Sequence, residues 1–236
     1  KSCPINGTYR YNLLKDAHLR VNAVTGTPCE QEQTGVRQPG NNKFYGNVFD
    51  CSGTSEVSLD NYNGTNSAGG TRQIDGVQWY NNTLKGCAIW FNVEDDPGWY
   101  GTLSIHDNAY SGNISSSNLV FERCLWHHNT GWAFNNNAYD SQKDWRRCYY
   151  DCSDGQPCTD TRSPTLSAWQ ADSGQDKNSI APNGGCKLNA DYTLASGSPC
   201  RTAGTGGGIL GFEALTSCVG YRCGNAPPNS PLSEGK

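Results

Sequence analysis

The stretch Val77-Gln-Trp79-Tyr-Asn-Asn82 is the first of four similar stretches in this chain. Each has an apolar residue, an outward residue, a second apolar residue and a polar turn residue three places further on. The other three stretches are Leu103 to Asn108, Cys124 to Asn129 and Cys148 to Ser153. Such alternation is typical of β-strands, and a repeat of about 21 to 26 residues indicates stacked coils. The repeat therefore predicts an all-β fold, a parallel β-helix or solenoid.

Equivalent residues of successive coils in such a fold lie about 4.8 Å apart and touch. We therefore expect one interior column, made of Trp79, Ile105, Trp126 and Tyr150. We expect a second column at the turn, a ladder of hydrogen-bonded amides from Asn82, Asn108 and Asn129. Long helices are not expected, because Gly, Asn and Asp interrupt the apolar runs.

The 12 cysteines have no zinc-module spacing and predict disulfides formed in an oxidising compartment. Cys124 and Cys148 occupy equivalent positions of two coils, at a separation that a disulfide can span. Proximity in the sequence alone suggests three further pairs, Cys152 with Cys158, Cys186 with Cys200, and Cys218 with Cys223. N-glycosylation sequons begin at Asn6, Asn63, Asn81 and Asn113. Both features predict an extracellular protein, secreted or at the cell surface, that carries covalent N-glycans.

Charge and composition exclude several classes of partner. The formal net charge is -4, only 17% of the residues are charged, and Lys and Arg form no basic run. Nucleic acids and anionic membranes are therefore poor partners, and no apolar stretch approaches the roughly 18 residues of a membrane span. We divide the chain into an N-terminal cap or partial coil (1–44), the β-helix (45–223) and a tail (224–236) rich in Pro, Ser and Gly.

The stretch from Asp191 to Ala214, DYTLASGSPCRTAGTGGGILGFEA, carries a more specific signal. It resembles the closing segment of secreted right-handed parallel β-helix proteins, the pectate-lyase-like superfamily. The matching residues are Asp191, Tyr192, Leu194, Gly197, Ser198, Pro199, Gly204, Gly211 and Glu213. Cys200 replaces the usual Ala, and Arg201-Thr202 replaces an apolar-acidic pair. The resemblance implies a right-handed coil with disulfides and long loops, and it brings no catalytic residue with it.

Lyases of that superfamily use Lys or Arg as a base and Ca²⁺ held by carboxylates. Two groups of weak candidates could face each other across the coils in this way, Glu94, Asp95 and Asp96 on one side and Lys143, Arg146 and Arg147 on the other. Alternatively, the acidic group is a solvated turn and the basic group flanks a strand. Outside the lyase hypothesis, in which Ca²⁺ takes part, we expect no cofactor and no metal site.

Aromatic residues near the longer loops offer a different chemistry. Trp90, Trp99, Tyr100 and Tyr110 could stack on sugar rings or on another subunit, or could pack beneath loops. Three functions remain open. The first is a secreted structural glycoprotein that assembles with copies of itself, through its ends or its tail, as a filament or surface layer. The others are a polysaccharide lyase acting on an acidic glycan and a non-catalytic glycan-binding module. The missing catalytic signatures favour the structural function.

Overall fold

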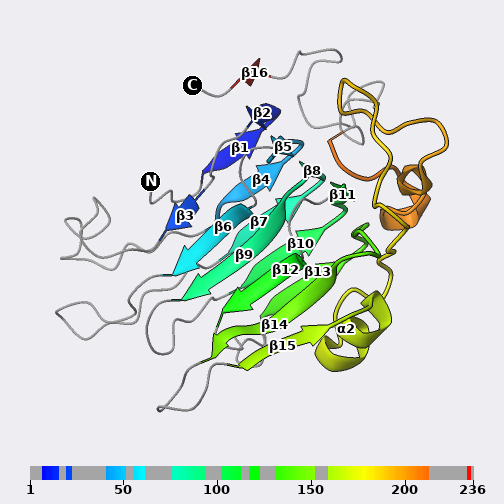
Figure 1. Ribbon diagram of the computed structural model, residues 1–236. Coiled ribbons are helices and arrows are strands. Elements are labelled where there is room, and N and C mark those ends of the chain that lie inside the picture. Colours follow the sequence, from blue (N-terminus) through cyan, green and yellow to red (C-terminus); the bar gives the residue numbers. More distant parts are fainter. Residues whose placement is uncertain are drawn as a thin grey trace, which may run out of the picture.

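The structure is a computed structural model that describes residues 7–15, 20–22, 41–51, 56–61, 76–93, 102–112, 117–122, 131–151, 159–212 and 233–234. Most of its strands lie in parallel register in three sheets (Figure 1). The first sheet has the order β1 (Thr8–Arg10), β4 (Lys43–Tyr45), β7 (Val77–Tyr80), β10 (Leu103–His106), β13 (Trp132–Asn135). The second has the order β11 (Ala109–Ser111), β8 (Thr83–Lys85), β5 (Val48–Asp50), β2 (Asn12–Lys15), β16 (Ser233–Glu234). The third has the order β15 (Thr159–Ser163), β14 (Asp144–Asp151), β12 (Ser117–Glu122), β9 (Ala88–Val93), β6 (Glu56–Asn61), β3 (Arg20–Asn22).

The chain visits the three sheets in turn, so that strands β1 to β12 pair with the third strand before or after them. We call each set of three successive strands a layer. Four complete layers run from β1 to β12. A fifth contains β13, a bridge at Ala138 and β14. Because parallel strands stack in register, equivalent side chains of successive layers lie over one another.

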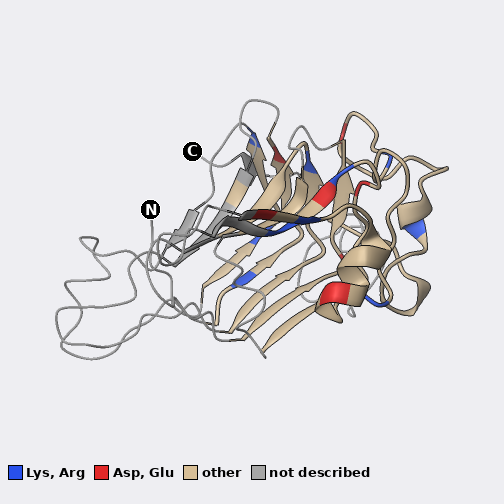
Figure 2. Cartoon of the chain, turned by 60° about the horizontal axis from the view of Figure 1, so that its bottom comes forward, with Lys and Arg blue, Asp and Glu red and all other residues tan. Residues whose placement is uncertain are grey.

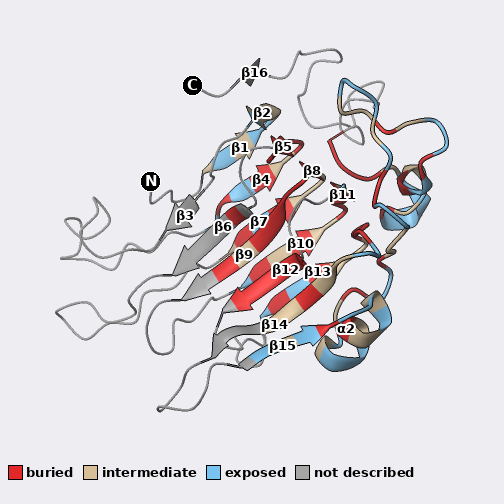
Figure 3. Ribbon diagram, in the orientation of Figure 1, coloured by how far each residue is buried: buried red, intermediate tan, exposed pale blue. Residues whose placement is uncertain are grey.

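The core consists of columns of such equivalent side chains, and Figure 3 shows the buried residues concentrated along the strands. The column in the first sheet follows the pairing of Tyr9, Phe44, Trp79, Ile105 and Phe134. Trp79 is fully buried, and its ring centroid lies 5.1 Å from that of Phe44. The expected pairing of Trp79 with Ile105 is therefore present.

The next members of this column differ from the sequence prediction. Ile105 pairs with Phe134, and Leu103 pairs with Trp132, so β13 takes the place that we assigned to Cys124 to Asn129. Trp126 and Asn129 lie outside the described residues. Tyr150 belongs to β14, which pairs with β12 in the third sheet and not with the Trp79 column. Strand β12 pairs with β14 as far as Glu122, two residues before Cys124, and the next described strand, β13, begins at Trp132.

A ladder of five asparagines lies at the turn between the first and second sheets. Its members are Asn12, Asn47, Asn82, Asn108 and Asn137. In each pair the amide nitrogen of one residue donates to the amide oxygen of the next, at distances from 2.9 to 3.2 Å. The prediction was correct for Asn82 and Asn108, whereas Asn137 occupies the position that we gave to Asn129.

The residue before each ladder asparagine has a left-handed backbone conformation. These residues are Tyr11, Gly46, Asn81, Asp107 and Asn136, with φ between 51° and 63°. Asn, Asp and Gly adopt this region most readily, so the turn favours them. Tyr11, in the first layer, is the exception.

The last layer is covered by β15 and α2 (Leu166–Ser173). Strand β15 is antiparallel to β14, and α2 begins after Thr165, whose hydroxyl accepts a hydrogen bond from Ala168 N. Trp169 of α2 is buried and stacks on Phe121 at a centroid distance of 5.4 Å. Gln175 then bonds to both Phe134 N and Trp132 O on the outer edge of β13. This end of the stack is thus closed by the chain's own residues.

Residues 186–212, which we call the cover, lie against the outer face of the second sheet (Figure 1). Small outward residues, Thr83, Ala109 and Ala138, make room for it, and all three are buried. The resemblance implied a last coil at this position. Instead the cover adds no strand to the three sheets and folds back over them.

Candidate functional site

Two of the three basic residues proposed for a lyase form ion pairs with carboxylates of the same chain. Arg147 Nη1 lies 3.3 Å from Asp172 Oδ2 in α2, and Arg146 Nε lies 3.9 Å from Asp160 Oδ1 in β15. Lys143 precedes β14 at a turn, where its backbone N–H donates to Asp140 O. Glu94, Asp95 and Asp96 lie outside the described residues. The geometry around Arg146 and Arg147 is that of ion pairs that hold β15 and α2 against β14.

Other predicted site residues have mixed outcomes. Tyr110 is fully buried in the core beside Tyr139 and does not lie exposed near a loop. Trp90 is half-buried in β9, and Trp99 and Tyr100 lie outside the described residues. Within the described ranges, no group of three or more His, Cys, Asp and Glu could hold a metal ion. Of the four sequon asparagines, the structure describes Asn81, which is half-buried in the turn after β7.

Two disulfides lie in the described part of the chain. Cys186 and Cys200 are joined within the cover, the pairing that their proximity in the sequence suggests. Cys51 and Cys87 join the second and third layers, and no sequence signal pointed to this pair. Cys124, Cys152, Cys158, Cys218 and Cys223 lie outside the described residues, as does the side chain of Cys148 in β14.

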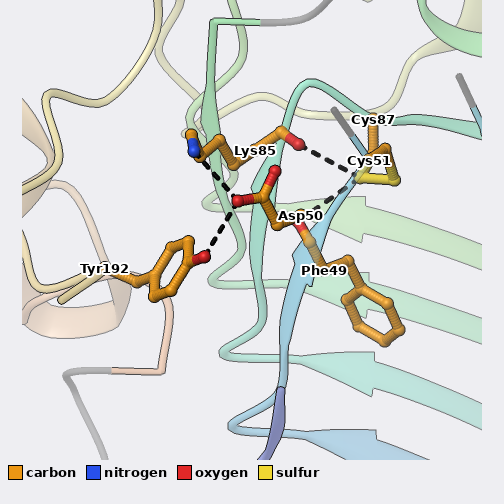
Figure 4. The surroundings of a disulfide bond; sticks show 6 residues. All are labelled: Phe49, Asp50, Cys51, Lys85, Cys87 and Tyr192. Carbon is orange, nitrogen blue, oxygen red and sulfur yellow. Dashed lines mark hydrogen bonds and ion pairs between the residues drawn. A yellow bond between two sulfur atoms is a disulfide. The ribbon is translucent and has the colours of Figure 1, made fainter. Parts of the chain in front are cut away.

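A charged cluster lies beside the Cys51–Cys87 disulfide (Figure 4). Lys85 Nζ and the Tyr192 hydroxyl each lie 2.9 Å from Asp50 Oδ2, and Lys85 Nζ lies 5.5 Å from the Tyr192 ring centroid. Asp50 is nearly buried, so its charge needs these partners. The cluster therefore ties the cover to the second sheet and supplies no obvious nucleophile.

A strip of one exposed and four half-buried side chains at the end of the first sheet is the strongest candidate for binding. We call it the tyrosine–histidine strip, and it consists of Arg10, Tyr11, Tyr45, Tyr80 and His106. Tyr45 stacks on Tyr80 at 4.9 Å, and Tyr80 stacks on His106 at 5.2 Å with an interplanar angle of 3°. Arg10 Nη1 donates to the Tyr45 hydroxyl at 3.2 Å. The strip crosses four layers.

A loop of the cover borders the strip at its His106 end. Asp107 accepts hydrogen bonds from Thr205 N at 2.7 Å and from the Thr205 hydroxyl at 2.9 Å, and it lies 2.7 Å from His106 Nδ1. Burial on its own would raise the pKa of Asp107, but the bonds from His106 and Thr205 outweigh it and lower that pKa. Asp107 is thus an ionised, fully engaged carboxylate.

The pKa values of Tyr11 and Tyr80 are raised, chiefly because partial burial disfavours the phenolate and also because other phenols lie close by. Both side chains therefore stay protonated near neutral pH and act as hydrogen-bond donors, not as bases. We did not predict this strip from the sequence, although an aromatic residue follows each of the inward residues Phe44, Trp79 and Ile105.

The edge of the second sheet is a further candidate surface. Strand β16 pairs in parallel with β2, with Ser233 opposite Asn12 and Glu234 opposite Leu13. Elsewhere on this end of the stack, β1 pairs with β4 and β3 pairs with β6, and the described residues place no strand on their other edges.

Charged residues make up 17% of the chain, and Figure 2 shows Lys and Arg (blue) and Asp and Glu (red) at scattered positions along the described ribbon. No helix among the described residues is long and apolar enough to cross a membrane. Comparison of the chain with protein-family models, curated proteins and solved structures gives no match.

Proposed function

We propose that this chain is a secreted structural glycoprotein, built as a right-handed parallel β-helix of the pectate-lyase-like type, that assembles with copies of itself through its C-terminal tail. Three parallel sheets visited in turn by successive strands are compatible with that architecture. Parallel strands joined by crossovers are nearly always right-handed, which supports the handedness. The two disulfides are compatible with secretion.

The observation that carries the proposal is the pairing of the tail strand β16 with the edge of β2. A strand edge offers unpaired N–H and C=O groups, and an extended segment from another copy can satisfy them as well as one from the same chain. Exchange of an identical element between copies needs no new contact surface. The tail of each copy would then occupy β2 of the next.

The two ends of the stack are unequal, and this supports assembly through the tail over direct stacking. Gln175 and the residues after it bond to the outer edge of β13, and β15 covers β14. Direct stacking of this end on the first layer of another copy would require these bonds to break. Tail exchange leaves them intact, so we favour the tail over end-to-end contact between sheets.

The lyase hypothesis gains no support from the described residues, because Arg146 and Arg147 are engaged in ion pairs within the chain. The partly exposed tyrosine–histidine strip favours the third hypothesis, glycan binding, as an additional property of the same molecule. Glycan binding is compatible with a structural role.

Substitution of both tail-strand residues by proline tests the assembly. Ser233→Pro with Glu234→Pro removes the N–H groups that a strand needs, whereas Asn229→Pro with Ser230→Pro adds as many prolines outside β16. We expect the unchanged chain and the control to form dimers or larger species in light scattering, and the β16 variant to be monomeric. A labelled peptide of residues 224–236 should bind the β16 variant in trans. A chain that stays monomeric at high concentration, together with a peptide that does not bind, would contradict the proposal.

A further inference from the structure

The tyrosine–histidine strip presents polar ring edges to solvent. Rings that stack on the equivalent rings of neighbouring layers cover one another's faces, as Tyr45, Tyr80 and His106 do. The ring planes therefore stand perpendicular to the sheet, and the hydroxyl groups of the tyrosines point away from it. A sugar ring cannot insert between these faces. Recognition along the strip must therefore use hydrogen bonds at the ring edges.

The strip is rich in donors and carries one fixed positive charge. Arg10 is exposed, lies 5.7 Å from the Tyr11 ring centroid and bonds to the Tyr45 hydroxyl. Because that hydroxyl oxygen accepts from Arg10, its own O–H remains a donor. The carboxylate of Asp107 is held by Thr205 and His106 and follows β10, three layers from Arg10, so it adds little repulsion for an anion bound at Arg10.

The side chains of the strip are regularly spaced, and a loop limits the strip on one side. Arg10, Tyr45, Tyr80 and His106 occupy equivalent positions of four successive layers, at a spacing of about 4.8 Å along a line that crosses the strands, and Tyr11 adds a second ring in the first layer. The loop at Thr205 bonds to Asp107 and to Asn136 and limits the strip on that side. A linear polymer with regularly spaced acceptors matches such a row better than a compact ligand does.

We propose that the tyrosine–histidine strip binds a polysaccharide that carries carboxylate or sulfate groups. Arg10 bonds to the anionic group, and the hydroxyls of Tyr45 and Tyr80 donate to sugar oxygens. A planar guanidinium suits both carboxylate and sulfate, so two sources share this chemistry. The inference does not depend on assembly through the tail, because the stacked rings of the strip belong to β4, β7 and β10, whereas β16 pairs with β2.

Titration with defined polymers tests the inference. Polygalacturonate supplies carboxylates, chondroitin sulfate supplies sulfates, and laminarin is a neutral control. The protein is used after enzymatic removal of N-glycans, because the sequon at Asn81 adjoins Tyr80. We expect one or both acidic polymers to bind, with an affinity that falls as salt is added, and laminarin to bind at least tenfold more weakly.

Two variants locate the site. Arg10→Gln should weaken binding roughly tenfold, the loss expected for one charge-assisted hydrogen bond. Tyr80→Phe keeps the ring stack and removes the donor, and it should weaken binding about threefold. The matched controls are Lys177→Gln, an exposed cation in the residues after α2, and Tyr192→Phe, a phenol beside Asp50.

Three results would contradict the proposed binding site or the class of its ligand. Failure of both acidic polymers to bind, or equal losses for Arg10→Gln and Lys177→Gln, would overturn the site. Equal affinity for laminarin would overturn the anionic class of ligand. Thermal unfolding of each variant shows that it is folded. Oligomeric state, measured on the same samples, distinguishes a failed strip from failed assembly.

Discussion

Asp176 is the residue at which the asparagine ladder ends. Each ladder amide donates to the next, so the last one needs an acceptor, and Asn137 Nδ2 donates to Asp176 Oδ1 at 3.1 Å. Ser179 bonds to the same oxygen, while Trp169 Nε1 and the Tyr139 hydroxyl bond to Oδ2. Burial raises the pKa of Asp176, and these four donors oppose the rise.

Asp176→Asn should lower the free energy of unfolding by about 2 kcal/mol, the cost of one buried donor without an acceptor. The hydroxyls of Ser179 and Tyr139 can rotate, but the Trp169 and Asn137 N–H groups cannot, and they lie on opposite oxygens. Either orientation of the new amide therefore leaves one of them unsatisfied. Chemical denaturation measures the effect. Asp191→Asn, at an exposed carboxylate, is the control, and an equal loss in both variants would refute this account.

The asparagine ladder connects the layers through side chains, in addition to the strand pairing of the three sheets. Asn82 is fully buried and makes four bonds through its side chain: its Oδ1 accepts from the backbone N and Nδ2 of Asn47, and its Nδ2 donates to Phe44 O and Asn108 Oδ1. The same arrangement recurs at Asn47 and Asn108. A single side chain thus serves three successive layers.

Asn82→Ala should cost roughly 3 kcal/mol or more, because it leaves several buried polar groups without partners. Asn189→Ala removes an exposed amide that bonds to Thr193 and should cost less than about 1 kcal/mol. Urea unfolding of the two variants in parallel measures both values. If the two losses were similar, the ladder would not contribute to the link between layers.

At the same scale, the sequence predicted the pairing of the layer at Trp79 with the layer at Ile105 but not the one after it. Trp126-His-His-Asn129 has the same pattern of side chains as Phe134-Asn-Asn-Asn137, so local pattern could not distinguish them. The pairing of β12 through Glu122 with its neighbours distinguishes them, and pairing is a property of the folded chain. The tyrosine–histidine strip could be predicted from the aromatic residues at outward positions of successive layers. The hydrogen bonds of Asp176 could not, because they join segments that are distant in the sequence.

Across the whole molecule, stability should be greatest in the middle of the stack. A strand such as β7 has a neighbour on both sides, whereas β1 pairs with β4 and the described residues place no strand on its other edge. In folds of stacked units, each unit is held chiefly by its nearest neighbours, so terminal layers open first.

Hydrogen exchange followed by mass spectrometry should therefore show the slowest exchange in peptides that contain β7 and β10, and faster exchange in those that contain β1 and β3. Peptides of β13 should resemble β10, because Gln175 and α2 cover that end. Fast exchange at β13, equal to that at β1, would show that the C-terminal covering does not protect the stack.

Gly211 gives the cover a vulnerability of its own. Its φ is +72°, and a methyl group there would lie 2.5 Å from Thr83 Oγ1 and 3.0 Å from the side chain of Ala109. Gly211→Ala would thus push the cover away from the second sheet, while the hydrogen bonds within the sheets would remain. Such a variant would keep its far-UV circular dichroism spectrum and yet expose apolar surface beneath the cover. We therefore expect it to aggregate before it unfolds.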